Sequence, residues 1–159
     1  KIPDKMFSTH SETDIYVTYW LSKIWLALKL RESIIPDDKM VKVNIIIDEL
    51  HQVEHCQEFL SDILQEMPKY RGKMVFSMHS LNQVKGIRDK LRETNSTFML
   101  IAGCDKDNYK ELKEELLPYT VEDLLKLERF TSLNLVKLPD GYVKFVTKLP
   151  PELKSIKAG

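Results

Sequence analysis

The stretch Val43-Asn44-Ile45-Ile46-Ile47-Asp48-Glu49 decides the fold that we expect for this chain. It is a short run rich in β-branched apolar residues, and a run of this length and composition is typical of a buried strand. Asp48 and Glu49 follow directly, at the carboxyl end of that strand. Ligands of open α/β sheets bind at the edge where the strands end, so these two carboxylates are the first candidates for a functional site.

Helical and strand-like segments alternate around this run. Ser11 or Thr13 is expected to cap a helix that runs to about Leu30 and, being apolar nearly all round, is largely buried. This order predicts an α/β fold with a mainly parallel sheet flanked by helices and a C-terminal β-hairpin around Pro139-Asp140-Gly141. The other expected helices cover residues 53–66, 81–93, 108–117 and 121–127, and the expected strands cover residues 42–47, 73–78, 97–102, 132–138 and 142–148.

The composition is that of an ordinary globular domain, with 43% hydrophobic and 30% charged residues in a chain of 159. We expect residues 1–150 to form one domain and residues 151–159 to be a tail or linker. Basic and acidic residues balance at 24 each, which leaves nucleic-acid binding open because a local basic face is still possible. Two cysteines, no visible signal peptide and no apolar run long enough to span a bilayer favour a cytoplasmic protein. The chain starts without Met, so we expect a piece of a larger protein.

A second polar segment, Ser77-Met78-His79-Ser80-Leu81-Asn82-Gln83, follows the next expected strand. Adjacent parallel strands end at the same sheet edge, so His79 is expected close to the two carboxylates, where a polar residue can position water or sense a phosphate. Gln83 lies one helical turn further on and is expected to face the same cleft. The alternative is that Ser77 or Ser80 simply caps the next helix, and both can hold together.

Two further groups of residues are compatible with chemistry but are less favoured. His51 and His55 are spaced i, i+4 and lie near Cys56, yet no third ligand has the spacing of a zinc site. Cys56 and Cys104 are more typical of buried small apolar residues than of nucleophiles. Basic residues that flank the second strand are candidates for an arginine finger, although a solvated face is the simpler interpretation: Lys69, Arg71, Lys73, Arg88 and Arg92.

Taken together, residues 43–49 and Phe76-Ser77-Met78-His79-Ser80-Leu81-Asn82-Gln83 resemble the second half of a RecA-like P-loop ATPase. Within that group the chain is most similar to bacterial ATPases of conjugative type IV secretion systems, which are related to hexameric DNA translocases. Residues 97–103, 130–134 and 144–150 are similar to the C-terminal part of such ATPases. The resemblance implies a hexameric motor that uses ATP and Mg²⁺. It also implies action with secretion or conjugation subunits at the inner face of the membrane, on DNA or protein.

The resemblance also implies roles for individual residues. Asp48 matches the Walker B acid that holds Mg²⁺ through water, and Glu49 matches the acid that orients the attacking water. His79 stands where relatives often carry Gln at the end of the following strand, and Gln83 is similar to a second polar position. Relatives often carry Arg-Lys where this chain has Pro68-Lys69, which leaves the arginine finger unassigned.

The gravest departure of the chain from the ATPase pattern is that no G-x-x-x-x-G-K-[ST] loop occurs among its residues. The first hypothesis is therefore that the phosphate-binding loop lies upstream in a longer parent ATPase, and that this piece alone is inactive. The second is a non-catalytic RecA-like module for assembly or partner docking. The third is a metal-dependent nuclease built on Asp48, Glu49 and the histidines.

Overall fold

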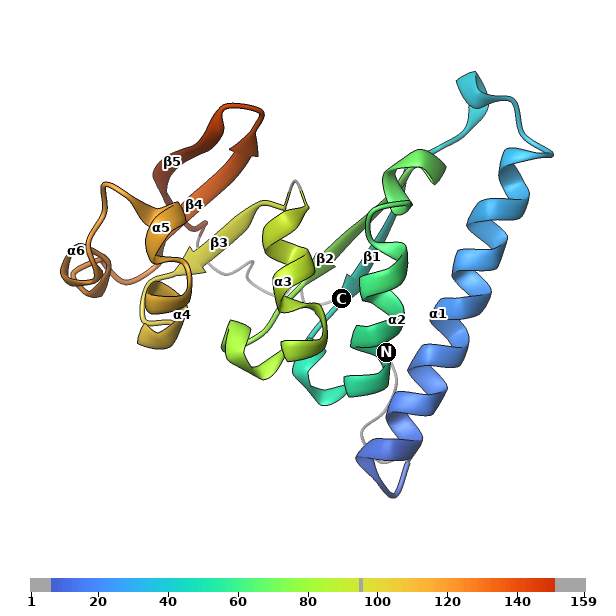
Figure 1. Cartoon of the computed structure of the whole chain (residues 1–159), viewed down its shortest axis with the longest axis horizontal. Coiled ribbons are helices and arrows are strands. Elements are labelled where there is room, and N and C mark those ends of the chain that lie inside the picture. Colours follow the sequence, from blue (N-terminus) through green and yellow to red (C-terminus); the bar gives the residue numbers. More distant parts are fainter. Residues whose placement is uncertain (1–6, 95, 151–159) are drawn as a thin grey trace, which may run out of the picture. The chain divides into compact units, whose positions relative to one another are not determined.

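The computed structural model describes residues 7–94 and 96–150 of the chain. Its contacts divide the chain into two compact units, residues 1–94 and residues 95–159. The first unit contains helices and a short parallel sheet, and the second contains short helices and an antiparallel sheet (Figure 1). The mixed α/β character predicted from the sequence is therefore confirmed. The two units are described separately below.

The first unit begins with the long helix α1 (His10–Glu32). Its N-terminus is closed by a capping box in which the Thr9 side chain accepts from the Glu12 N–H and the Glu12 carboxylate accepts from the Thr9 N–H. The prediction that this helix is largely buried is wrong. It packs along one side, where Asp14, Leu21, Trp25 and Leu28 are buried, and it exposes apolar residues elsewhere: Ile15, Tyr19, Trp20, Ile24, Leu26 and Leu30.

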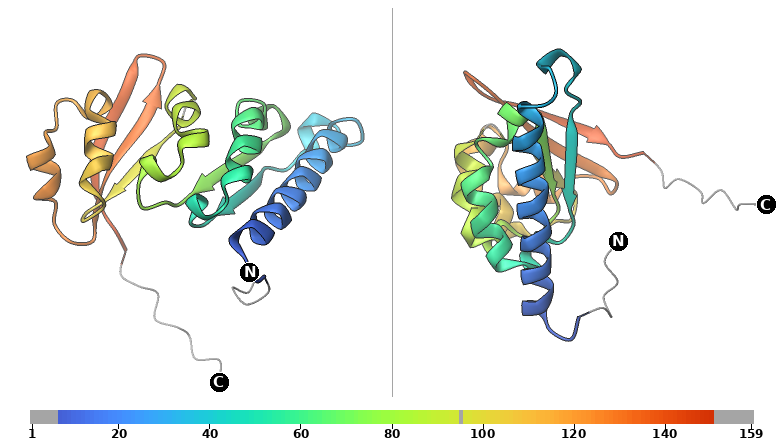
Figure 2. Two further views of the ribbon diagram at one scale, coloured as in Figure 1. Left: turned by 60° about the horizontal axis from the view of Figure 1, so that its bottom comes forward. Right: turned by 90° about the vertical axis from the view of Figure 1, so that its right-hand side faces the viewer.

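Two parallel strands, β1 (Val43–Ile47) and β2 (Gly72–Phe76), form the sheet of the first unit. Their register pairs Val43 with Gly72 and Ile47 with Phe76, so both strands end at the same edge. The helices α2 (Glu54–Ile63) and α3 (Lys85–Glu93) follow β1 and β2 and lie on the same side of this sheet (Figure 2). The order strand, helix, strand, helix is the one that the sequence predicts.

The other face of this two-stranded sheet is exposed. Ile46 pairs in register with Val75, and these side chains remain 74% and 54% exposed. The expectation that the run 43–47 is a fully buried strand is therefore wrong for one of its two faces, because helices cover only the opposite face. The core between sheet and helices contains residues that are at most 2% exposed: Leu50, Cys56, Leu60, Met67, Val84 and Ile87.

Asp14 of α1 joins the first helix to the second. Its carboxylate is 5% exposed and accepts the backbone N–H groups of His55 at 2.7 Å and Cys56 at 3.0 Å. These are free donors of the first turn of α2, and Val53, the residue before that helix, has no side chain able to cap them. Asp14 therefore acts as the N-cap of a helix 41 residues away in sequence.

Within residues 96–150, the described part of the second unit, the short helices are α4 (Lys106–Glu111), α5 (Lys113–Leu116) and α6 (Val121–Leu125). Its sheet has the order β3-β4-β5, with β3 (Phe98–Ile101), β4 (Thr131–Leu138) and β5 (Gly141–Lys148). The predicted C-terminal hairpin is confirmed, and Gly141 in its turn has a φ of +129°, a value that favours glycine.

The direction of β3 differs from the sequence prediction of a mainly parallel sheet. β3 pairs antiparallel with β4, and Ile101 at the end of β3 lies opposite Ser132 at the beginning of β4. The helical segment between these strands thus returns the chain to the end of β3 that it has just left, which makes the next strand run in the opposite direction. Among the described residues, the parallel pairing is confined to β1 and β2.

Candidate functional site at the carboxyl end of β1

Asp48 and Glu49 lie directly after β1, and both residues are exposed. The neighbouring strand continues alongside them, because the Ser77 N–H donates to the Ile47 carbonyl at 3.0 Å and the Ser77 carbonyl accepts the Leu50 N–H at 3.0 Å. Ser77 is thereby held next to both acids. The carboxyl ends of the two strands meet, as parallel pairing requires.

The Ser77 hydroxyl connects the two acids. It donates to Asp48 Oδ1 and accepts the backbone N–H of Glu49 at 3.1 Å. The second oxygen of Asp48, Oδ2, makes no hydrogen bond within residues 7–94 and 96–150. One oxygen of this exposed carboxylate is therefore fixed by a hydroxyl while the other is open to a ligand.

Glu49 has a left-handed backbone, with φ 53° and ψ 51°. A non-glycine residue in this region is strained by about 1–2 kcal/mol and needs support from its surroundings. The chain turns here into the short 3-10 helix η2 (Leu50–Gln52), and the Gln52 side-chain amide donates to Glu49 Oε2. Gln52 was not singled out from the sequence, although its position three residues after Glu49 on a tight helix is a signal that could have found it.

His79 lies on the other side of the Glu49 carboxylate, with 4.0 Å between His79 Nε2 and Glu49 Oε1. Its side chain is 74% exposed, so any ion pair with Glu49 is weak. The ring of His51 lies 5.5 Å from the ring of His79, centroid to centroid. The strand pairing thus brings together a histidine from each strand-end segment, and one of them, His79, lies beside Glu49.

Gln83 takes part in a cap of its own turn. It ends the 3-10 helix η4 (Leu81–Gln83), and its Oε1 accepts the Ser80 N–H at 3.2 Å while Ser80 Oγ accepts the Asn82 N–H at 3.3 Å. This is a capping box, the alternative that the sequence left open for Ser80. Among the described residues, Gln83 makes no hydrogen bond to Asp48 or Glu49, and its amide oxygen accepts within its own turn.

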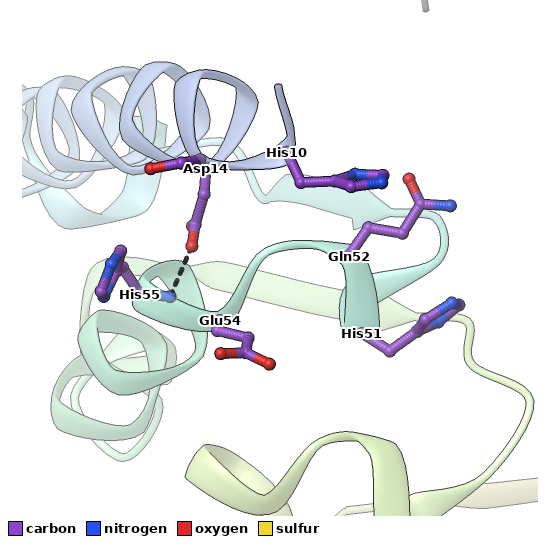
Figure 3. Close-up of a pocket in the computed structure, with 7 residues that line it drawn as sticks. His10, Asp14, His51, Gln52, Glu54 and His55 are labelled. Carbon is purple, nitrogen blue, oxygen red and sulfur yellow. Dashed lines mark hydrogen bonds between the residues drawn. The ribbon is translucent and has the colours of Figure 1, made fainter. Parts of the chain in front are cut away.

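A pocket of about 520 Å³ is lined by His51 and by Gln52, the residue whose amide donates to Glu49. Figure 3 shows that His10, Gln52 and His51 point toward one side, whereas His55 lies on the far side of Asp14. The three histidines therefore do not converge. The remaining lining residues are Ser11, Asp14 and Glu54.

His51, His55 and Cys56, which the sequence offered as a possible metal site, do not lie together in a metal-binding arrangement. His51 belongs to η2 and His55 to α2, so they do not share one helix face. Cys56 is fully buried, and burial together with the nearby Asp14 carboxylate raises the pKa of its thiol to about 12, which keeps it protonated and unreactive. Across the described ranges, no group of three or more His, Cys, Asp or Glu side chains is arranged to hold a metal ion.

Three of the basic residues near β2 have partners within the first unit. Arg71 forms a two-point pair with Asp37, at 3.2 Å from Nε to Oδ1 and 3.0 Å from Nη2 to Oδ2. Lys69 lies 3.7 Å from Glu32, whose charge raises the pKa of the lysine. Arg88 donates to Asn82 at 3.3 Å. These contacts fit the simpler interpretation of a solvated, internally paired face.

The donor set at Asp48 and Glu49 suits a hard cation held through water. Mg²⁺ prefers carboxylate oxygens and retains several waters, and two exposed carboxylates stand next to each other at this sheet edge. Asp48 Oδ2 is the oxygen available to such a water. The phosphate-binding backbone of a P-loop is not encoded in these 159 residues, so this chain contributes acids but no phosphate cradle.

In comparisons with known proteins, no protein-family model matches this chain, and no curated protein sequence matches it significantly. Among the described residues, no helix combines the length and apolar character needed to cross a bilayer.

Proposed function

We propose that this chain supplies the Walker B half of an ATP-hydrolysing motor with a RecA-like core. The single observation that carries the proposal is the pair Asp48 and Glu49 at the carboxyl end of a parallel strand, with the polar end of the adjacent strand beside it. Nucleotide-binding α/β sheets place their catalytic acids at this edge. The family resemblance of residues 43–49 and 76–83 points to the same chemistry.

In this proposal Asp48 would hold Mg²⁺ through a water molecule, and a bound Mg²⁺ would supply positive charge next to the phosphates. Glu49 orients the attacking water and accepts a proton from it. Its carboxylate is held on one oxygen by the Gln52 amide and has His79 near the other. His79 is suited to report on a phosphate or a water next to Glu49 because it is exposed and lies at the end of the neighbouring strand.

The finer proposal concerns the parent protein. We infer that it assembles as a hexamer and powers transfer of DNA or protein in conjugation or type IV secretion. It would then work in the cytoplasm at the inner face of the membrane, together with other subunits of that machinery. The phosphate-binding loop would come from an upstream part of the same polypeptide. These inferences rest on the resemblance.

The test is ATP turnover by the complete protein and its Glu49→Gln variant. Glutamine keeps the size of the side chain and its bond to Gln52 but cannot accept a proton, so we expect turnover to be abolished while ATP binding is largely kept. Glu58→Gln, at an exposed acid of α2 that lines neither the site nor the pocket beside it, is the matched control and is expected to turn over ATP normally. Normal turnover in Glu49→Gln would remove the Walker B assignment.

A second candidate, a non-catalytic docking module, is favoured by a different observation. The outer face of the β1–β2 sheet and part of α1 present exposed apolar side chains, and contiguous apolar surface of this kind marks interaction sites. Calorimetric titration of ATP into the complete protein distinguishes the two candidates. Absence of nucleotide binding would favour the docking module.

A further inference from the structure

We propose that Ser77 is the positioning residue of the paired carboxylates, an inference that rests on the proposed function. The sequence offered Ser77 only as a possible helix cap. The cap of η4 is instead Ser80, which leaves the Ser77 hydroxyl for the acids. Its hydroxyl has one proton to donate, and that proton goes to Asp48 Oδ1.

The same hydroxyl holds the backbone of Glu49. It accepts the Glu49 N–H at 3.1 Å, at a residue whose left-handed φ of 53° needs support. That backbone turn leads directly into η2, where Gln52 donates to the Glu49 carboxylate. Ser77 thus fixes a side-chain oxygen of one acid and the backbone of the next. Both bonds involve one oxygen atom, so the two acids are oriented together.

The position of Ser77 is itself determined by the sheet. Its N–H and carbonyl continue the pairing of β2 with the segment after β1, at 3.0 Å to Ile47 and 3.0 Å to Leu50. The backbone of Ser77 is therefore fixed next to the end of β1, within reach of its side-chain hydroxyl. Pre-organisation of this kind is what catalytic carboxylates require, because small displacements of a reacting group lower rates strongly.

The test compares Ser77→Ala with Ser77→Thr in the complete protein. Loss of one hydrogen bond to a charged catalytic group predicts a roughly tenfold to hundredfold fall in kcat for the alanine variant. We also expect the Mg²⁺ concentration for half-maximal turnover to rise, while ATP affinity changes little. Threonine keeps a hydroxyl on the same carbon and is expected to restore both values to near those of the native protein. Ser80→Ala, which removes a helix cap and no contact to the acids, is the control for general loss of structure.

A second readout does not depend on ATP. Hydrogen exchange of the Glu49 amide, followed by NMR, is expected to become at least several-fold faster in Ser77→Ala, and to stay slow in Ser77→Thr, because the bond at 3.1 Å protects this amide. Unchanged exchange in the alanine variant would overturn the positioning role, whatever the enzymology shows. Unchanged kcat and Mg²⁺ requirement, while Glu49→Gln is inactive, would overturn the inference and leave the proposed function standing. If exchange of the Glu49 amide is faster in Ser77→Ala but Glu49→Gln turns over ATP normally, the proposed function is refuted, and with it the catalytic part of this inference.

Discussion

Replacement of Asp14 by alanine tests the link between the first two helices of the N-terminal unit. The carboxylate is 5% exposed and accepts two backbone N–H groups of α2, those of His55 and Cys56, at 2.7 and 3.0 Å. Alanine leaves these two donors without an acceptor at the buried N-terminus of α2. We therefore expect the Asp14→Ala protein to be clearly less stable while its fold is retained.

The size of this effect follows from the individual contacts. A hydrogen bond to a charged group contributes about 1.5–3 kcal/mol, and loss of an N-cap costs about 0.5–2 kcal/mol. Desolvation of the buried carboxylate offsets part of the gain from two such bonds. We expect the free energy of unfolding to fall by about 2–4 kcal/mol. Asp14→Asn keeps one oxygen acceptor without the charge, so its loss should be about half as large.

Urea unfolding followed by tryptophan fluorescence measures this change directly. Both tryptophans of the chain, Trp20 and Trp25, belong to α1, and the buried Trp25 packs edge-on against Tyr70 at 5.0 Å between ring centroids. Asp62→Ala is the matched control, because this exposed acid lies at the opposite, C-terminal end of α2, where a negative charge does not help the helix dipole. A change below about 0.5 kcal/mol in Asp14→Ala would refute the capping role, since that is the scale of ordinary surface substitutions.

Two further predictions concern burial. Cys56 should titrate with a pKa of about 12 in the folded protein, against an ordinary value of 9.0. Between about pH 9 and 12 the thiol loses its proton only in the unfolded protein, so the free energy of unfolding should fall as the pH rises through this range. Ultraviolet absorbance of the thiolate, with the other cysteine replaced by serine, measures this, and ionisation of the folded protein near pH 9 would contradict it. Leu50→Ala should lower the free energy of unfolding by about 2–5 kcal/mol because the side chain is fully buried, whereas Ile46→Lys on the exposed sheet face should change it by less than about 0.5 kcal/mol. Equal losses for both variants in urea unfolding would mean that the outer face of the sheet is covered.

The sequence carried enough information to locate the candidate site. The β-branched run before Asp48 specifies a strand locally, and the polar segment after β2 marks the end of its neighbour. Once the two strands are parallel and adjacent, the proximity of His79 to Glu49 follows from the register alone.

The structural features that the sequence did not predict depend on contacts between distant segments or on local hydrogen bonds of side chains. The direction of β3 is set by where the chain returns after the helices of the second unit, which no local pattern encodes. The burial of α1 depends on which neighbours cover it, and an apolar sequence does not say which face is covered. Asp14 finds its partners 41 and 42 residues away. Gln83 closes a capping box with Ser80, a local contact of its side chain that was not predicted.

ATP binding and turnover by the complete protein, measured side by side for the native sequence and Glu49→Gln, test the central claim most directly. The account predicts that the native protein hydrolyses ATP in the presence of Mg²⁺, and that the variant binds ATP with similar affinity but does not turn it over. Turnover at the native rate by the variant, or a native protein that binds no nucleotide, would contradict it.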